Sequence, residues 1–397
     1  MSASPHAHAC GETDTLIASV EFPANVYCLE LAGDEDRFAA CEAAAAATAA
    51  EVVAPGLATA RGVDLARLRT LAYTRAASDC FARTDADIAS AERALSVAAI
   101  ERTGSVAVRA RDVRSTTGVS TQAAERRLGS VLVDRGFRVD LDDPDHELRA
   151  LFSGRDDDSV CLLGWLAAES RRDFGERRPT DRPFFQPGSM APIDARALVN
   201  IAGAAPDTTV VDPMCGTGGL LLEAALVGAN VVGLDAQWKM TRGSRANLDA
   251  IGSADTDSDT DTDSDMVTDS DMVTDSDMVT DSDMDTDTPA APTATIIHGD
   301  ATSLPLCDGC ADAVVFDAPY GRQSKIANHD LAALVGGALA EAGRIAPRAV
   351  VVADRSWETA AEAAGWTVDA RFERRVHGTL VRQVHVLSAV DSPDTDA

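Results

Sequence analysis

The chain has 397 residues, 45% of them apolar, a net charge of −29 and eight scattered cysteines. This length predicts two or three domains with separate cores. No run of 18 apolar residues occurs, which argues against a membrane-spanning helix. The scattered cysteines favour reduced thiols over a disulfide framework, and residues 1–18 lack the pattern of a signal peptide, so we expect a cytoplasmic protein.

The acidity of the chain is its most unusual bulk property. Residues 253–288 contain 14 Asp and no Lys, Arg or Glu, yet the rest of the chain still carries a net charge of −15. Only two lysines occur beside 33 arginines. An acidic, lysine-poor surface predicts a halophile, because a salty cytoplasm screens self-repulsion. A coding bias toward Ala, Arg and Asp is the alternative.

The first part of the chain is predicted to be a small α+β domain behind a flexible extension. The extension covers residues 1–24, and the domain covers residues 25–100. Within it, residues 26–31 are apolar enough for a strand, and an Ala-rich helix is expected over 36–50.

A second α+β domain is expected over residues 101–168. Residues 106–109 alternate like a half-buried strand, and residues 121–135 have the apolar spacing of an amphipathic helix. Residues 137–144 predict a strand stopped by its final proline, and residues 159–166 predict another.

A polar, arginine-rich linker over residues 169–190 should lead to a C-terminal domain over 191–390. Asp194 should cap a helix that runs to about residue 204. Beyond it, apolar runs alternate with helical stretches in the βα rhythm of a parallel sheet. Seven strands are expected, at 209–212, 230–234, 294–298, 312–317, 348–353, 367–373 and 380–388. The last two should pair as an antiparallel hairpin at the sheet edge.

An acidic segment interrupts this rhythm at residues 253–292. From Asp265 the hexapeptide Asp-Met-Val-Thr-Asp-Ser recurs several times. Its charge and lack of bulky apolar residues exclude a core, so it should be a disordered insertion in a surface loop. Its role stays open.

Neither of two possible metal-binding features matches a known ligand set, so we expect no metal. The acidic repeat lacks the Gly turn and the bidentate Glu of a calcium loop. Cys307 and Cys310 form a lone Cys-x-x-Cys, whereas zinc usually needs two more ligands nearby.

A glycine-rich turn follows the first strand of the C-terminal domain, in Asp212-Pro-Met-Cys-Gly-Thr-Gly-Gly219. Its glycines let the backbone approach a ligand closely, and the helix that follows favours a carboxylate or phosphate. The acid at the strand end can meet an ammonium group, which a pyrophosphate would not favour. S-adenosylmethionine, which carries an amino-acid moiety, therefore fits better than a dinucleotide.

Further acids end the next strands. Asp235 could accept hydrogen bonds from ribose hydroxyls, and Asp300 from an adenine amino group. A plain helix cap is the alternative for each acid alone. Their recurrence at successive strand ends favours a nucleoside site.

The turn Asp317-Ala318-Pro319-Tyr320 is the sharpest signal in the chain. The Asp317 carboxylate and the Ala318 carbonyl can both accept hydrogen bonds from an exocyclic amine. Two acceptors would aim its lone pair at a methyl group, and Tyr320 offers a face on which a base can stack. The alternative is a loop turn with a surface tyrosine. With the neighbouring cofactor motif, the turn predicts methyl transfer to a nucleobase amine.

Five strings together resemble the archaeal, in particular haloarchaeal, tRNA (guanine-10-N2)-methyltransferase or dimethyltransferase family: residues 178–190, 212–219, 235–240, 317–321 and 375–382. The resemblance implies a Rossmann-like class I methyltransferase with a seven-stranded sheet, preceded by ferredoxin-like and THUMP domains. The THUMP likeness covers residues 107–144. The usual turn of the family is Asp-Pro-Pro-Tyr, and alanine replaces its first proline here. The acidic repeat has no counterpart in the family pattern.

The resemblance also implies roles for individual residues. Asp317, Ala318, Pro319 and Tyr320 would hold the guanine. The S-adenosylmethionine site would comprise Asp212, Gly216, Thr217, Gly218, Asp235 and Asp300, with Phe185, Pro187 and Gly188 around the methionine end.

The expected partner is tRNA, with no membrane and no DNA. Residues 101–138 carry eight Arg against four acids, and Arg109, Arg111 and Arg114 are candidates for phosphate contacts. The alternative is that these arginines pair with neighbouring acids. Other readings left open are methylation of another tRNA or rRNA guanine, and a non-catalytic RNA-binding protein. Mono- or dimethylation is not decided by the sequence; nor is the oligomeric state, for which a monomer is the expectation.

Overall fold

The computed structural model describes residues 20–21, 25–155, 158–254, 292–320, 330–377 and 380–390. The extension predicted for residues 1–24 lies outside the described residues except for Val20–Glu21. The acidic insertion predicted for residues 253–292 lies outside them except at its two ends. Both therefore stay predictions.

The described chain divides into two compact units. Unit 1 draws on residues 1–36, 48–63 and 76–169, and unit 2 on residues 37–47, 64–75 and 170–397. Two short N-terminal segments thus pack with the C-terminal unit. The sheet of unit 1 takes strands from both sides of residue 100, and the predicted domain limits stay predictions.

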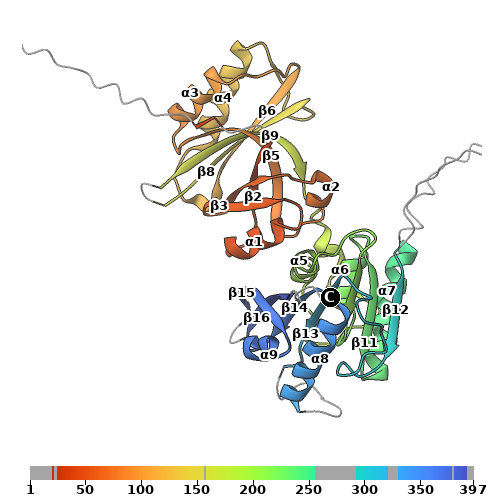
Figure 1. The fold of residues 1–397 in the computed structure, drawn as a ribbon. Coiled ribbons are helices and arrows are strands. Elements are labelled where there is room, and N and C mark those ends of the chain that lie inside the picture. The colour runs from red at the N-terminus through yellow and green to blue at the C-terminus, as the bar shows by residue number, and fades with distance from the viewer. Residues whose placement is uncertain are drawn as a thin grey trace, which may run out of the picture. The chain divides into compact units, whose positions relative to one another are not determined.

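Unit 1 is built around a mixed sheet in the order β3-β4-β2-β5-β9-β8-β6-β7, with β1 paired to β5 (Figure 1). Its strands are β1 (Val20–Glu21), β2 (Val26–Leu31), β3 (Ala49–Ala54), β4 (Leu57–Arg61), β5 (Thr74–Asp85), β6 (Ser105–Asp112), β7 (Arg138–Val139), β8 (His146–Ser153) and β9 (Val160–Glu169). Helices α3 (Ile88–Val97) and α4 (Thr121–Asp134) share a buried core with the sheet, and a short 3₁₀ helix spans Val113–Ser115.

Two predictions about the N-terminal half need correction, and one strand was missed. The Ala-rich helix expected over 36–50 is α1 (Asp36–Ala43) only, because residues 49–54 pair with β4 as a strand. Tertiary pairing here overrides helix propensity. The strand expected over 137–144 is limited to β7, and β8 was not predicted.

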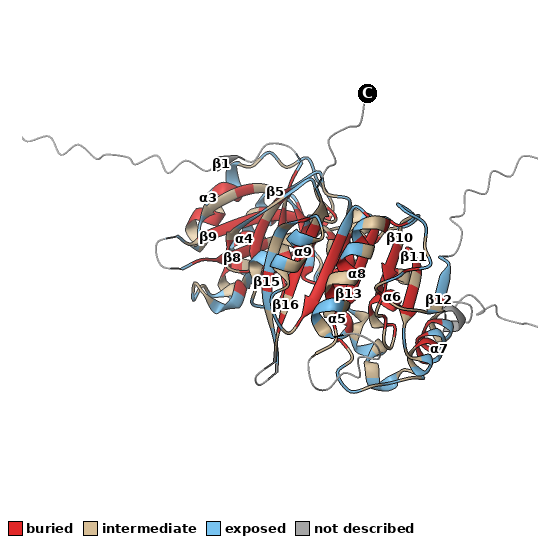
Figure 2. Cartoon of the chain, turned by 60° about the horizontal axis from the view of Figure 1, so that its bottom comes forward, coloured by how far each residue is buried: buried red, intermediate tan, exposed pale blue. Residues whose placement is uncertain are grey.

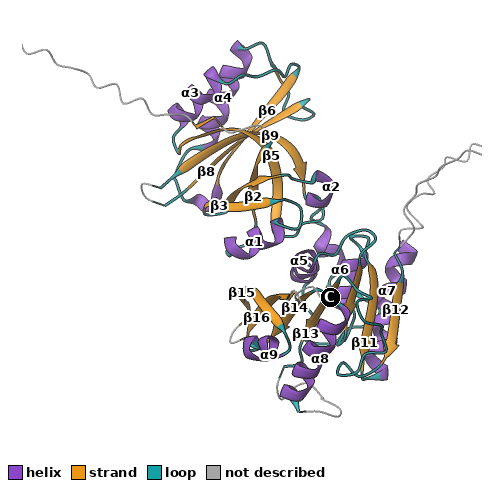
Figure 3. Ribbon diagram, viewed as in Figure 1, coloured by secondary structure: helices purple, strands orange, loops and turns teal. Residues whose placement is uncertain are grey.

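Unit 2 contains a seven-stranded sheet, and helices alternate with its strands along the chain (Figure 3). Its strands are β10 (Thr209–Asp212), β11 (Asn230–Asp235), β12 (Ala294–His298), β13 (Ala313–Asp317), β14 (Arg348–Ala353), β15 (Trp366–His377) and β16 (Leu380–Ala389). Its helices are α1, α2 (Leu65–Leu68), α5 (Pro192–Ala202), α6 (Gly219–Ala225), α7 (Trp238–Ala254), α8 (Leu331–Ile345) and α9 (Glu358–Ala363). Two 3₁₀ helices, Asp173–Arg177 and Pro179–Asp181, lie in the predicted linker.

The sheet of unit 2 has the order β12-β11-β10-β13-β14-β16-β15. Strand β16 runs in the direction opposite to the other strands of this sheet. Residues 313–316 of β13 are all buried (Figure 2), so both faces of the central strand are covered. The predicted α/β fold, its seven strands and its terminal hairpin are confirmed. Among the described helices, none has both the length and the apolarity needed to cross a bilayer.

Asp194 does not cap α5 as predicted. The helix begins at Pro192, with Ala191 as its N-cap, because proline is well suited to the first helical turn. The Asp194 carboxylate instead accepts hydrogen bonds from the Tyr73 hydroxyl at 2.7 Å and from Arg374 at 2.9 Å. Arg374 in turn lies over the rings of Phe38 and Tyr73. A segment from the N-terminal half therefore forms part of the core of unit 2.

Candidate active site

Asp317 ends β13 and starts the turn that the sequence singled out. Its carboxylate accepts a hydrogen bond from the Tyr320 hydroxyl, and its Oδ2 lies 3.7 Å from Nη2 of Arg382. Arg382, on β16 and only 5% exposed, also donates from Nε to the Tyr320 hydroxyl at 3.0 Å. These three side chains form one polar cluster at the carboxyl end of the strand.

Burial changes the acidity of this cluster. It raises the pKa of Asp317 to about 6, although Arg382 and the Tyr320 hydroxyl oppose the shift. Burial and the neighbouring Asp317 carboxylate also raise the pKa of Tyr320 above its usual range. Tyr320 is therefore a neutral hydrogen-bond donor, while Asp317 can change its charge near neutral pH.

Ala318 explains how the turn tolerates its departure from the family pattern. The residue is 2% exposed, and its N–H donates to the Val352 carbonyl at 2.8 Å. Proline has no N–H and could not make this bond. The alanine therefore extends the β13–β14 ladder by one bond where a proline would supply ring rigidity. Pro319 and Tyr320 are half-buried.

The glycine-rich turn follows β10, the strand beside β13. Gly216 and Gly218 have φ of 52° and 77°, the left-handed region that favours glycine. A Cβ on Gly218 would also lie 2.4 Å from Oγ of Ser244. The backbone at both positions thus requires glycine, as the sequence predicts for a ligand-binding turn.

Asp212 is a buried carboxylate at the end of β10. It is 2% exposed, and its Oδ1 accepts a hydrogen bond from the Met214 N–H at 3.0 Å. Burial raises the pKa of Asp212, and the nearby carboxylates of Asp235 and Asp317 raise it further. Within the described ranges, no basic side chain pairs with it. An ammonium group would offset this charge, so the residue fits the amino end of an amino-acid ligand.

The other two predicted strand-end acids have mainly local bonds. Asp235 accepts hydrogen bonds from Gln237 N–H at 2.8 Å and from Gly216 N–H at 3.1 Å. It therefore ties the glycine-rich turn to β11. Asp300 accepts from both the N–H and the hydroxyl of Thr302. The structure brings Asp212 and Asp235 beside the same turn, whereas Asp300 follows β12 at the edge of the sheet.

The predicted linker is anchored to the glycine-rich turn. Asn247, 1% exposed, binds both the N–H and the carbonyl of Phe184 at 2.8 Å and also donates to the Thr217 carbonyl at 2.9 Å. The hydroxyls of Ser189 and Thr217 lie 3.2 Å apart. Between these anchors lie the predicted wall residues, all exposed: Phe185, Pro187 and Gly188.

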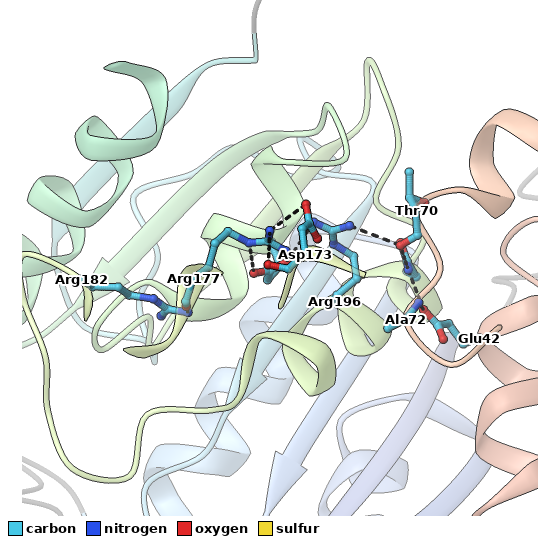
Figure 4. Close-up of polar contacts among 9 residues, drawn as sticks. Glu42, Thr70, Ala72, Asp173, Arg177, Arg182 and Arg196 are labelled. Atoms are coloured by element: carbon cyan, nitrogen blue, oxygen red, sulfur yellow. Dashed lines mark hydrogen bonds and ion pairs between the residues drawn. The ribbon is translucent and has the colours of Figure 1, made fainter. Parts of the chain in front are cut away.

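A charge network centred on the buried Glu223 includes residues of this linker (Figure 4). Glu223 of α6, fully buried, accepts from Nε and Nη2 of Arg177 at 3.1 and 3.2 Å, and lies 2.8 Å from Nη2 of Arg196. Arg177 also pairs with Asp173 at 2.9 Å. Arg196 reaches the Thr70 carbonyl at 3.3 Å. The network therefore joins the linker, α5, α6 and the 64–75 segment.

The three arginines proposed to bind tRNA lie in unit 1, and each has an acidic partner. Arg111 pairs with Glu30 at 2.7 Å, and Arg114 with Asp36 at 2.5 Å. Nε of Arg109 lies 3.8 Å from Glu147, while its Nη2 donates to the Leu141 carbonyl at 2.6 Å. Their acidic partners all lie outside residues 101–138, so a count of charge within that window could not reveal them.

Arg382 and Asn247 are site residues that the sequence reasoning did not assign. Arg382 shares the buried, alternating face of β16 with Val384. A basic residue on such a face needs a buried partner, and this was the available signal. Asn247 lies on α7 and offered no comparable signal, because asparagine is also common on exposed helix faces.

Comparison with known proteins shows what the chain is similar to. The profile described as RMKL-like, methyltransferase domain, matches residues 179–383, slightly more than half of the chain. The chain is 31% identical to the tRNA (guanine(10)-N2)-dimethyltransferase of Methanothermobacter thermautotrophicus over 280 residues, 68% of this chain and 70% of that protein. It is 28% identical to the protein of the same name from Pyrococcus abyssi over 292 residues, 72% and 74% of the two chains. Its similarity to the crystal structure of TrmN from Thermus thermophilus has a TM-score of 0.45 at 21% identity, over 92% of this chain and 100% of that chain. The extent of the family match and of the first of these relatives shows that the chain belongs to the tRNA (guanine(10)-N2)-dimethyltransferase family and carries its methyltransferase domain.

Proposed function

We propose that this chain transfers methyl groups from S-adenosylmethionine to the exocyclic N2 amine of the guanine at position 10 of tRNA, giving N2-methyl- and N2,N2-dimethylguanosine. One observation carries the proposal. The Asp317 turn and the buried carboxylate of Asp212 end two neighbouring parallel strands. A crevice between such strand ends is where open α/β sheets bind their ligands.

The residues around the glycine-rich turn suit the methyl donor. Asp212 would bind its ammonium group, and the turn at Gly216 and Gly218 would lie against its amino-acid end. Asp235 would accept from the ribose hydroxyls, and Asp300 from the adenine amine. When bound, S-adenosylmethionine supplies an electrophilic methyl group on sulfur.

The catalytic turn would position the guanine. The Asp317 carboxylate and the Ala318 carbonyl accept hydrogen bonds from the 2-amino group and so direct its lone pair. Tyr320 presents its ring to the base, and its hydroxyl, held by Asp317 and Arg382, keeps that ring in place. The nitrogen lone pair forms the new N–C bond as the C–S bond breaks. One amine proton then leaves to Asp317 or to water.

The pH dependence of the reaction follows from the raised pKa of Asp317. A free aspartate is ionised above about pH 4, whereas Asp317 stays protonated up to about 6. The protonated acid loses one acceptor for the amine and cannot take its proton. We expect kcat/KM to fall as the pH decreases through about 6. Initial rates at constant ionic strength between pH 5 and 8 test this, and a rate that is flat across that interval would contradict the role of Asp317.

The substrate can be tested with unmodified tRNA transcripts and labelled S-adenosylmethionine. Guanosine at position 10 should be methylated, while inosine there, which lacks only the 2-amino group, should not. Nucleoside analysis then separates mono- from dimethylation. Transfer to the inosine transcript, or to ribosomal RNA instead, would identify another guanine as the target. No transfer to any RNA would favour a non-catalytic binding protein.

We propose that unit 1, with its ferredoxin-like and THUMP-like parts, holds the tRNA. Arg109, Arg111 and Arg114 remain candidates for phosphate contacts, although their acidic partners would have to release them. The target base lies in a paired stem, so it must be extruded before reaction. A tRNA substrate is consistent with the cytoplasmic location expected from the sequence. The monomer expected from the sequence stays a prediction.

A further inference from the structure

Arg182, a residue of the linker, lies beside the charge network of Glu223 but forms no ion pair with it among the described residues (Figure 4). Arg177 forms ion pairs with Glu223 and Asp173, and Arg196 forms one with Glu223. Arg182 donates only from Nη2, to the Arg177 carbonyl at 3.2 Å. Its Nε and Nη1 are covered from solvent and have no hydrogen-bond partner in the described part of the chain. The three arginines and two acids leave one positive charge uncompensated.

Nη1 of Arg182 lies beside the glycine-rich turn. A Cβ on Gly219, the last glycine of the turn, would lie 3.2 Å from Nη1 of Arg182. The chain at Phe184, two residues further on, is bound by Asn247, which also binds the Thr217 carbonyl. Arg182 is therefore held against the same turn that the methyl donor is proposed to occupy.

An unpaired guanidinium at this place needs an anion. Burial lowers the pKa of Arg182, the Glu223 carboxylate opposes this shift, and the neighbouring Arg177 adds to it, so the net direction reflects the cost of the charge in this environment. Its Nε and Nη1 carry three N–H donors without acceptors. A carboxylate placed here would satisfy donors that otherwise stay buried and unpaired.

We propose that Arg182 binds the carboxylate of the amino-acid part of the methyl donor. The inference rests on the proposed function and adds to it a residue that selects the zwitterionic end of the ligand. Asp212 meets the ammonium group at the start of the glycine-rich turn, and Arg182 meets the carboxylate at its end. The two charges have opposite signs, and among the described residues neither forms an ion pair, so the ligand would supply a partner for each.

Two ligands that differ only in the carboxylate test this directly in the full-length protein. S-adenosylhomocysteine has the carboxylate, and S-adenosyl-3-thiopropylamine retains the amine but lacks it. We expect the wild type to bind the first about 10- to 100-fold more tightly, the range for a charge-assisted hydrogen bond. Arg182→Met should weaken S-adenosylhomocysteine by a similar factor and leave S-adenosyl-3-thiopropylamine within about twofold. Arg178→Met, at an exposed position of the same linker, is the control and should change neither affinity.

Calorimetric titrations measure these affinities, and each outcome supports or overturns the proposed role of Arg182. Equal weakening of both ligands by Arg182→Met would assign Arg182 a structural role and overturn the proposal, as would no weakening at all. Arg182→Gln, which keeps a polar side chain, should show the same selective loss if the methionine variant does not fold. A wild type that binds both ligands equally tightly would overturn the role of Arg182 alone. A wild type that binds neither would overturn the proposed function as well.

Discussion

Replacement of Asp317 by alanine should lower the turnover of tRNA methylation by about 10²–10³-fold, as loss of one aligned polar contact does. The carboxylate ends β13 beside the cofactor turn and is held by Tyr320 and Arg382. Its loss removes an acceptor for the guanine amine and one anchor of the Tyr320 ring. Affinity for S-adenosylhomocysteine should change little, because Asp212 and the glycine-rich turn remain.

Single-turnover rates with saturating tRNA measure this effect apart from binding. Asp317→Asn keeps one acceptor but not the charge, so its loss should be smaller and should lack the pH dependence expected near 6. Asp308→Ala is the control, since that side chain is 82% exposed and pairs with Arg344 at the surface. Near-normal turnover of Asp317→Ala would mean that the catalytic turn lies elsewhere.

Replacement of Glu223 by alanine should lower the free energy of unfolding of unit 2 by about 3–5 kcal/mol, the cost of removing one partner from a buried ion pair. Glu223 is fully buried and accepts from both Arg177 and Arg196. Without it, Arg196 keeps the Thr70 carbonyl and Arg177 keeps Asp173, and both still lie over the Phe174 ring, but Arg196 loses its ion pair with a carboxylate. The linker that carries Arg182 should then loosen.

Denaturant unfolding at one fixed salt concentration measures this loss. Glu358→Ala is the matched control: its ion pair with Arg371 has both side chains more than 40% exposed, and such pairs contribute at most about 1 kcal/mol. Equal losses for the two variants would show that the buried network does not stabilise the unit. Because the chain is strongly acidic, the salt concentration must be the same for both.

The sheet of unit 2 and the positions of its motifs could be predicted from local sequence patterns. Strands buried on both faces are continuous apolar runs, and parallel topology brings their carboxyl ends to one edge. Reading β10, β11 and β13 from such runs was therefore enough to place Asp212, Asp235 and Asp317 at strand ends. The glycines at 216 and 218 were equally readable, because positive φ leaves glycine as the favoured residue.

Features that depend on partners distant in sequence became visible in the folded chain. Arg382 reaches Asp317 across 65 positions of chain numbering, and the acids beside Arg111 and Arg114 come from residues 30 and 36. The helix expected over residues 36–50 ends at Ala43, and residues 49–54 pair as β3 because β4 offers them a partner. The charge balance around Arg182 likewise depends on which acids the fold brings to Arg177 and Arg196. Local patterns fix what a residue can do, whereas pairing energies between distant segments decide which of these options the folded chain uses.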